Sequence, residues 1–207
     1  NGRIQFKVPI SSFGMIKQKL ADMAVRTYMS DSIMYRLAGM FDGKLGTLDA
    51  EAQKSGAENA KAIEEYAPEC SISKVYGSEA LDFCVDEYVQ ILGGYGFCAE
   101  YPAERYYRDS RINRIWEGTN EINRLLVPGT MMRRALQGRL NLLPAAMAIG
   151  EELMTYSPLS VELPDTPLAL QEHMVKMAKK IALMVAGVAA QKFQQDLAKE
   201  QEVLAKL

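Results

Sequence analysis

Apolar residues recur at three- and four-residue steps along most of the chain, which is the spacing of amphipathic α-helices. A first apolar stripe runs from Ile10 to Ala24, and Leu37 and Met40 extend it on the same helix or on a following one. A polar segment with three glycines, residues 42–58, predicts a loop or a helix break near residues 44–47. The members of the first stripe are Ile10, Phe13, Ile16, Leu20, Met23 and Ala24.

A second long helix is predicted over residues 48–92. Pro68 has no backbone N–H, so this helix has to bend or break there. Gly93 and Gly94 are expected to end it. The stripe that supports the helix consists of Cys70, Lys74, Gly77, Ala80, Leu81, Cys84, Tyr88 and Ile91.

Helix-start signals recur in the next part of the chain. Pro102 after Tyr101 predicts a short helix, because proline is favourable in a first turn. Thr119 or Asn120 is expected to cap the following helix, and Glu121 in its first turn complements the helix dipole. Proline and glycine at 128–129 should kink or end that helix.

The end of the chain predicts further helices after a proline-rich linker over residues 157–167. A final amphipathic helix should open at Thr166 and still be running at Leu207. No strand pattern of any length is present. The predicted fold class is therefore all-α: an antiparallel bundle of about four helices over residues 1–138, with a truncated helical extension over residues 139–207.

Composition narrows the function without deciding it. The net charge of −2 gives no general attraction to nucleic acid. The three cysteines follow no zinc or disulfide spacing and are expected to be buried, reduced thiols. His173 is the single histidine, so no metal site is predicted. The longest apolar run, residues 181–190, is half of the roughly 20 residues that a membrane span needs.

Two segments carry the candidate chemistry. Residues 90–97 read Gln-Ile-Leu-Gly-Gly-Tyr-Gly-Phe, and their glycines let the backbone turn sharply and approach a bulky anion. Residues 115–122 read Ile-Trp-Glu-Gly-Thr-Asn-Glu-Ile, which places Glu117 on a tight turn before a helix. From the residues alone, the first segment is typical of a helix C-cap, and a glutamate placed as in the second is usually an exposed acid at a helix start.

Together these segments resemble the flavin-contacting and base-bearing segments of the acyl-CoA dehydrogenase family. The resemblance covers residues 3–138, and the insertion over 49–69 with the tail beyond 138 is most similar to bacterial relatives of the very-long-chain branch. Because the chain starts inside a family motif and stops in mid-helix, it is expected to be a fragment. Further matching segments lie at residues 3–6, 9–10, 19–23, 100–109 and 111–114.

The resemblance implies an FAD-dependent enzyme that dehydrogenates acyl-CoA thioesters at the α and β carbons in fatty-acid β-oxidation. Glu117 is implied as the base that removes the α-proton, with its own backbone N–H and a ribityl hydroxyl of FAD holding the thioester oxygen. Gly118 would leave room for the substrate. Some members carry the base on an earlier helix, which would precede Asn1.

The resemblance also implies the cofactor contacts. Residues 90–94 and Arg3 would contact an FAD shared with a neighbouring subunit, so a homo-oligomer, dimer or tetramer, is expected. Gly14 stands where many members place a glutamine that contacts FAD. The implied FAD-binding residues are Arg3, Gln90, Ile91, Leu92, Gly93, Gly94, Thr119, Asn120 and Glu121. Separately, we interpret five charged residues as a structural ion-pair network that positions the Glu117 loop and has no catalytic role: Arg105, Arg108, Asp109, Arg111 and Arg114.

Electrons would pass to an electron-transfer flavoprotein, in the cytoplasm of a bacterium or in the mitochondrial matrix of a eukaryote. The isolated fragment is expected to be inactive. Two alternatives stay open: an acyl-CoA oxidase, and a non-catalytic assembly or scaffold protein built on the same bundle. The apolar stripe after Thr166 has to be covered by later helices, by the bundle or by a peripheral membrane contact, and later helices are favoured.

Overall fold

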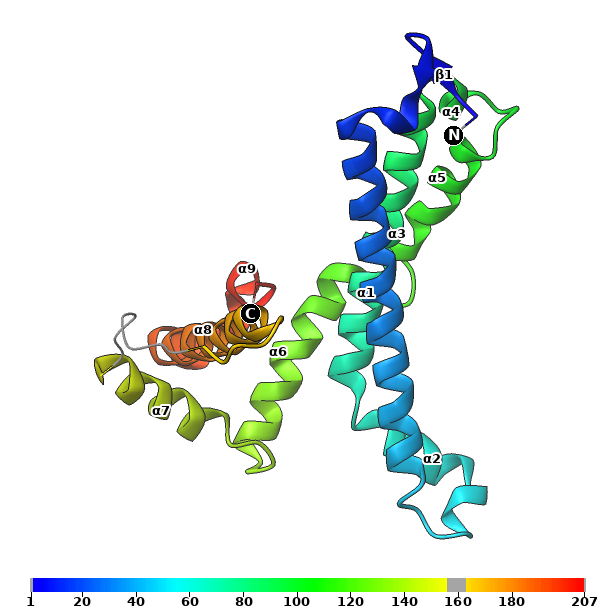
Figure 1. Cartoon of the computed structure of the whole chain (residues 1–207). Helices are drawn as coiled ribbons and strands as arrows, with labels where there is room; N and C mark the ends of the chain where they lie inside the picture. Colours follow the sequence, from blue (N-terminus) through cyan, green and yellow to red (C-terminus); the bar gives the residue numbers. More distant parts are fainter. Residues whose placement is uncertain (1, 156–162, 207) are drawn as a thin grey trace. The chain divides into compact units, whose positions relative to one another are not determined.

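The computed structural model describes residues 2–155 and 163–206, which are almost entirely helical (Figure 1). The all-α fold class is confirmed. The helices are α1 Gly14–Leu45, α2 Gly56–Glu64, α3 Ala67–Leu92, α4 Gly94–Phe97, α5 Ala103–Arg111, α6 Asn120–Leu136, α7 Leu142–Thr155, α8 Ala169–Phe193 and α9 Gln201–Leu204. The 3₁₀ helices are η1 Ile10–Ser12, η2 Ala52–Lys54, η3 Ile112–Arg114 and η5 Gln194–Lys199.

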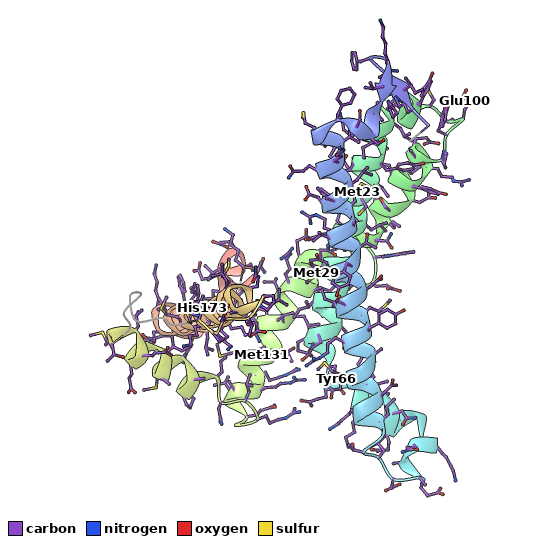
Figure 2. The ribbon with its side chains drawn as sticks, viewed as in Figure 1. Met23, Met29, Tyr66, Glu100, Met131 and His173 are labelled. Atoms are coloured by element: carbon purple, nitrogen blue, oxygen red, sulfur yellow. The ribbon has the colours of Figure 1, made fainter. Side chains whose placement is uncertain are left out.

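The chain divides into two compact units, one up to Asn123 and one from Arg124 onward. In the first unit α1 and α3 lie side by side and antiparallel, and α5 packs on α3 (Figure 1). Tyr66, which is labelled in Figure 2, precedes α3. Phe41 of α1 packs on it, with ring centroids 5.6 Å apart. The predicted domain boundary between residues 138 and 139 stays a prediction.

The predicted helix over residues 48–92 is broken into three pieces: η2, α2 and α3. Ser55 caps α2, because its hydroxyl accepts a hydrogen bond from the Glu58 N–H. Pro68 lies in the first turn of α3, where its missing N–H has no helical partner to lose. The sequence predicts either a bend or a break at Pro68, and the structure shows a break just before this proline.

Pro128 lies inside α6, which continues to Leu136, so of the two expected outcomes, a kink or an end, the helix does not end there. The last predicted helix, α8, begins at Ala169 and ends at Phe193, so the prediction that it runs to the chain end is wrong. Gln194 follows with a positive φ of 48°, a turn that no glycine or proline announces.

A small hairpin precedes α1. Its strands, β1 Ile4–Gln5 and β2 Val8–Pro9, pair antiparallel, and Phe6 and Lys7 form the turn with φ of 53° and 67°. The Ile10 N–H donates to the Arg3 carbonyl at 3.0 Å, which closes the hairpin base. Helix α1 thus begins at Gly14 and not at Ile10. The hairpin fixes where Arg3 lies.

The buried side chains of the first unit are mostly small, and several large apolar ones stay exposed. Along α1, Met15, Tyr28 and Tyr35 are each more than 70% exposed. Cys70 and Cys84 are partly buried and Cys98 is exposed, so the expectation of three buried thiols is wrong for Cys98. Exposed large apolar side chains are typical of surfaces that bind another protein or another domain.

In the second unit α7 and α8 pack against each other. A Cβ on Gly187 would lie 3.0 Å from the Cβ of Ala146, so the glycine permits the close approach of the two helices. Lys180 and Glu152 form an ion pair across them. Within the proline-rich segment expected at 157–167, residues 163–167 are not helical, and the earlier ones lie outside the described residues.

Candidate functional site

Glu117 lies on an exposed turn between η3 and α6. Its φ is 54° and that of Gly118 is 79°, so two successive residues have left-handed backbone. A glutamate in this region is uncommon and persists only where the surroundings determine it strongly. The turn therefore depends on contacts outside itself.

The carbonyl of Gly118 is the point at which the turn is held. It accepts a hydrogen bond from Lys74 Nζ at 2.8 Å and one from Asn123 Nδ2 at 2.8 Å. The Lys74 ammonium also donates to Asn120 Oδ1 at 2.7 Å. Both lone pairs of the Gly118 oxygen are thus in use, one toward α3 and one toward α6.

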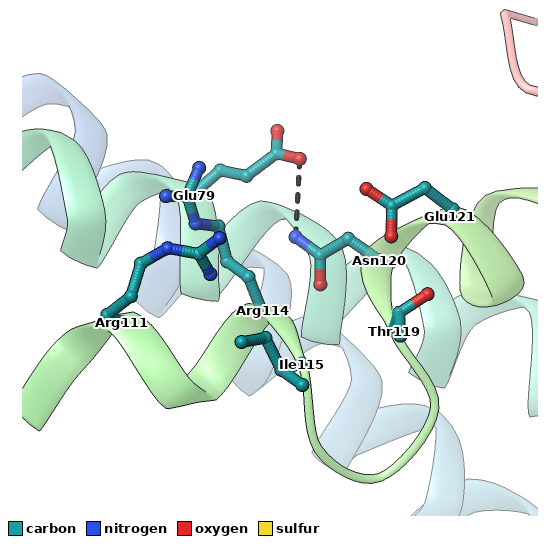
Figure 3. A pocket seen from close by; sticks show the side chains of 7 residues that line it. All are labelled: Glu79, Arg111, Arg114, Ile115, Thr119, Asn120 and Glu121. Atoms are coloured by element: carbon teal, nitrogen blue, oxygen red, sulfur yellow. Dashed lines mark hydrogen bonds between the residues drawn. The ribbon is translucent and has the colours of Figure 1, made fainter.

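Asn120 fastens the start of α6 to α3. Its side chain is only 3% exposed. Its Nδ2 lies 3.0 Å from Ser78 Oγ. The same nitrogen lies 3.3 Å from Glu79 Oε1 (Figure 3). With Lys74 on its Oδ1, the buried amide is fully hydrogen-bonded, as burial of such a group requires.

Thr119, not Asn120, supplies the capping side chain that the sequence left open between them. Its Oγ1 accepts a hydrogen bond from the Ile122 N–H at 3.3 Å. Hydrogen bonds from the Glu121 backbone and from Thr119, with the charges of Lys74 and Arg111, hold the pKa of the Glu121 carboxyl below its ordinary value. Because the pKa of Glu121 is lowered in the folded chain, these contacts stabilise the fold slightly at pH values above the ordinary carboxyl pKa. This stabilisation is lost as the pH falls through the lowered pKa.

A pocket lies beside this turn (Figure 3). Arg114 pairs with Asp82 of α3 at 3.0 Å, which supports a structural role for this member of the arginine cluster. Glu117 is not one of the residues that line this pocket, so its carboxylate lies outside it. The lining residues are Glu79, Arg111, Arg114, Ile115, Thr119, Asn120 and Glu121.

Arg3 and the glycine segment meet at the other end of α3. The Arg3 guanidinium donates to the Leu92 carbonyl and lies over the Tyr95 ring, 4.9 Å from its centroid. Gly93 has a φ of 60°, and a Cβ there would lie 3.3 Å from Arg3 Nη2. Gly94 has open space around it. The Arg3 guanidinium and the bare backbone of Gly93 are therefore adjacent, and their contact with FAD stays a prediction.

The two predicted clusters are not brought together within the chain. Lys74 and Gln90 lie sixteen residues apart on α3, which at 1.5 Å per residue is roughly 24 Å. Gln90, Gly93 and Gly94 are exposed, and Ile91 and Leu92 are partly buried. One end of α3 carries the glutamate turn and the other carries the arginine–glycine cluster.

Sequence reasoning missed the residues that hold the glutamate turn. Lys74 belongs to the helical stripe of α3, and a lysine within a stripe of small and apolar residues was the available signal. Among the described residues, no group of three or more histidine, cysteine or acidic side chains could hold a metal ion. None of the described helices is both long and apolar enough to span a membrane.

Comparisons with known proteins agree on one family. The family model described as "Acyl-CoA dehydrogenase, C-terminal domain" matches residues 1–132, and a second model of the same description matches residues 177–207. A "Probable acyl-CoA dehydrogenase" of Bacillus subtilis is 52% identical over 99% of the chain and 34% of its own length. A rat "Very long-chain specific acyl-CoA dehydrogenase, mitochondrial" is 40% identical over 66% of the chain and 17% of its own length.

Among solved structures, a Bacillus anthracis acyl-CoA dehydrogenase complexed with FAD superposes with a TM-score of 0.96 at 57% identity. The match covers 99% of the chain and 35% of that structure. The chain thus spans about a third of the length of these two Bacillus proteins.

Proposed function

Because the chain belongs to the acyl-CoA dehydrogenase family, we propose that the protein containing it dehydrogenates acyl-CoA thioesters with FAD as oxidant. The chain supplies the C-terminal helical part of that enzyme and, with it, the α-proton base. The observation that carries the proposal is the Glu117 turn: a left-handed glutamate whose next carbonyl is held by two side chains.

In the proposed mechanism Glu117 accepts the proton from the α carbon of the thioester. That C–H is a weak acid, so the carboxylate has to be placed against it and the developing charge on the thioester oxygen has to be stabilised. The backbone N–H of Glu117 is the donor that this chain offers to that oxygen. When bound, FAD supplies the acceptor for the β-hydride.

Arg3 fits the pyrophosphate of FAD, because a guanidinium binds phosphate oxygens in a bidentate manner and exposed Gly93 and Gly94 let backbone approach closely. Thr119, just before α6, and Glu121, in its first turn, are further proposed flavin contacts. The Asn120 side chain is committed to α3, so its proposed contact uses only its backbone.

We also propose that FAD is shared between subunits of a homo-oligomer. The separation of the two clusters along α3 supports this, because one chain does not gather them into one site. The exposed apolar side chains of α1 support further contacts with other parts of the enzyme. An electron-transfer flavoprotein is the proposed electron acceptor.

The full-length protein is expected to purify with bound FAD and to lose its flavin absorbance when an acyl-CoA is added without oxygen. Butanoyl-, octanoyl- and hexadecanoyl-CoA would serve as probes, since the chain length is open. Rapid reoxidation by air with peroxide formation would favour an acyl-CoA oxidase. A colourless protein that binds no FAD would contradict the proposal and favour a scaffold.

A further inference from the structure

Lys74 of α3 holds the glutamate turn, and the proposed function gives this side chain no role. Lys74 lies near the start of α3, forty-four residues before Gly118 in sequence. Its ammonium has three hydrogens, and two of them are used at 2.8 Å and 2.7 Å on Gly118 O and Asn120 Oδ1. The Lys74 side chain thus hydrogen-bonds to the residues on both sides of Thr119, Gly118 and Asn120.

Further side chains of α3 hold the start of α6 beside Lys74. Ser78 and Glu79 follow Lys74 by four and five residues on α3, and both contact the buried amide of Asn120. Residues four apart lie on one face of a helix. Helix α3 therefore presents a row of polar side chains to the turn, and such support from a helix is more precise than support from a loop.

The atom that Lys74 holds lies one residue beyond Glu117. Gly118 O belongs to the peptide between Gly118 and Thr119, so fixing this oxygen restrains the backbone rotation of Gly118, the left-handed residue that follows Glu117. Without Lys74, the oxygen retains only Asn123, and the two left-handed residues lose a restraint that keeps them from relaxing. Lys74 acts on the carboxylate through the backbone and does not need to touch the substrate.

We propose that Lys74 is a positioning residue that holds the Glu117 turn in the geometry required for α-proton removal. This inference rests on the proposed function for its kinetic consequence, but its structural consequence is independent of it. The ion pair between Lys19 of α1 and Glu87 of α3 provides a matched control, because it also joins a lysine to another helix but lies remote from the turn.

The test compares wild type, Lys74→Met and Lys19→Met in the full-length protein. Hydrogen–deuterium exchange should speed up in peptides covering residues 115–123 for Lys74→Met and not for Lys19→Met. Flavin reduction by saturating acyl-CoA should slow by about 100-fold for Lys74→Met, because a misplacement of about 1 Å costs that much. The apparent Kd for acyl-CoA should stay unchanged.

A kinetic isotope effect separates positioning from general damage. With the base misplaced, proton removal becomes slower relative to hydride transfer, so the effect of α-deuterated substrate should rise in Lys74→Met more than that of β-deuterated substrate. Lys74→Arg keeps a cationic donor with altered geometry and serves if Lys74→Met does not fold. It should show the same changes to a smaller extent.

Unchanged exchange in residues 115–123 for the Lys74 variant that folds would overturn the inference, as would an unchanged reduction rate and α-deuterium effect. If wild type is not reduced by any acyl-CoA, the proposed function fails, and the exchange experiment still decides whether Lys74 holds the turn.

Discussion

Glu117→Gln should reduce the rate of flavin reduction by acyl-CoA by about 10⁴-fold or more, at or beyond the upper end of what proton-transfer catalysis contributes. The amide has the size of the carboxylate but cannot accept the α-proton. The exposed position of Glu117 means that the substitution leaves the fold, the unfolding temperature and the FAD content unchanged. Stopped-flow absorbance under anaerobic conditions measures the rate.

Glu64→Gln is the control for loss of one carboxylate, since Glu64 ends α2 and is exposed. It should reduce flavin at the wild-type rate. A Glu117→Gln protein that bleaches at a near-normal rate would show that another group removes the proton.

Gly96→Ala should cause the largest loss of stability among the glycine substitutions near the proposed FAD segment. A Cβ at Gly96 would lie 2.6 Å from the Val89 carbonyl oxygen and 2.9 Å from Val89 Cα. Because both are backbone atoms, the turn between α3 and α4 has to shift. We expect a cost of about 1–3 kcal/mol or more, as for overpacked sites, together with weaker FAD retention.

Gly94→Ala is the matched control for stability, because nothing lies within 4 Å of a Cβ there and its φ is not left-handed. Thermal unfolding of the full-length protein and FAD content after gel filtration would be compared for both variants. Equal unfolding temperatures for the two would contradict the close contact between Gly96 and Val89.

The local parts of the fold could be predicted from sequence because their signals are local. Gly93 ends α3 as expected, and the first turn of α5 follows Pro102. The end of α8 at Phe193 could not be predicted, because Gln194 carries no residue preference for its left-handed conformation. Pro128 leaves two outcomes open, a kink or an end of the helix, and the continuation of α6 to Leu136 excludes the end.

In the candidate site, too, the local turn could be predicted from the sequence and the distant contacts that support it could not. The Glu117 turn is visible in the order Glu-Gly-Thr, since glycine permits the left-handed step and threonine caps the helix. Its support is not visible, because Lys74 contacts Gly118 and Ser78 contacts Asn120 only in the folded chain, across more than forty residues of sequence. A helical stripe places Lys74 on the inner face but does not say which carbonyl it will meet.

The central claim is that Glu117 of this chain is the base of an FAD-dependent acyl-CoA dehydrogenase. Its most direct test is an anaerobic reaction of excess acyl-CoA with full-length wild type and with Glu117→Gln, followed by mass analysis of the thioester. We predict one 2-enoyl-CoA formed for each flavin reduced in wild type, and no product in the variant on the same timescale. No enoyl-CoA from wild type, or equal amounts from both proteins, would contradict the account.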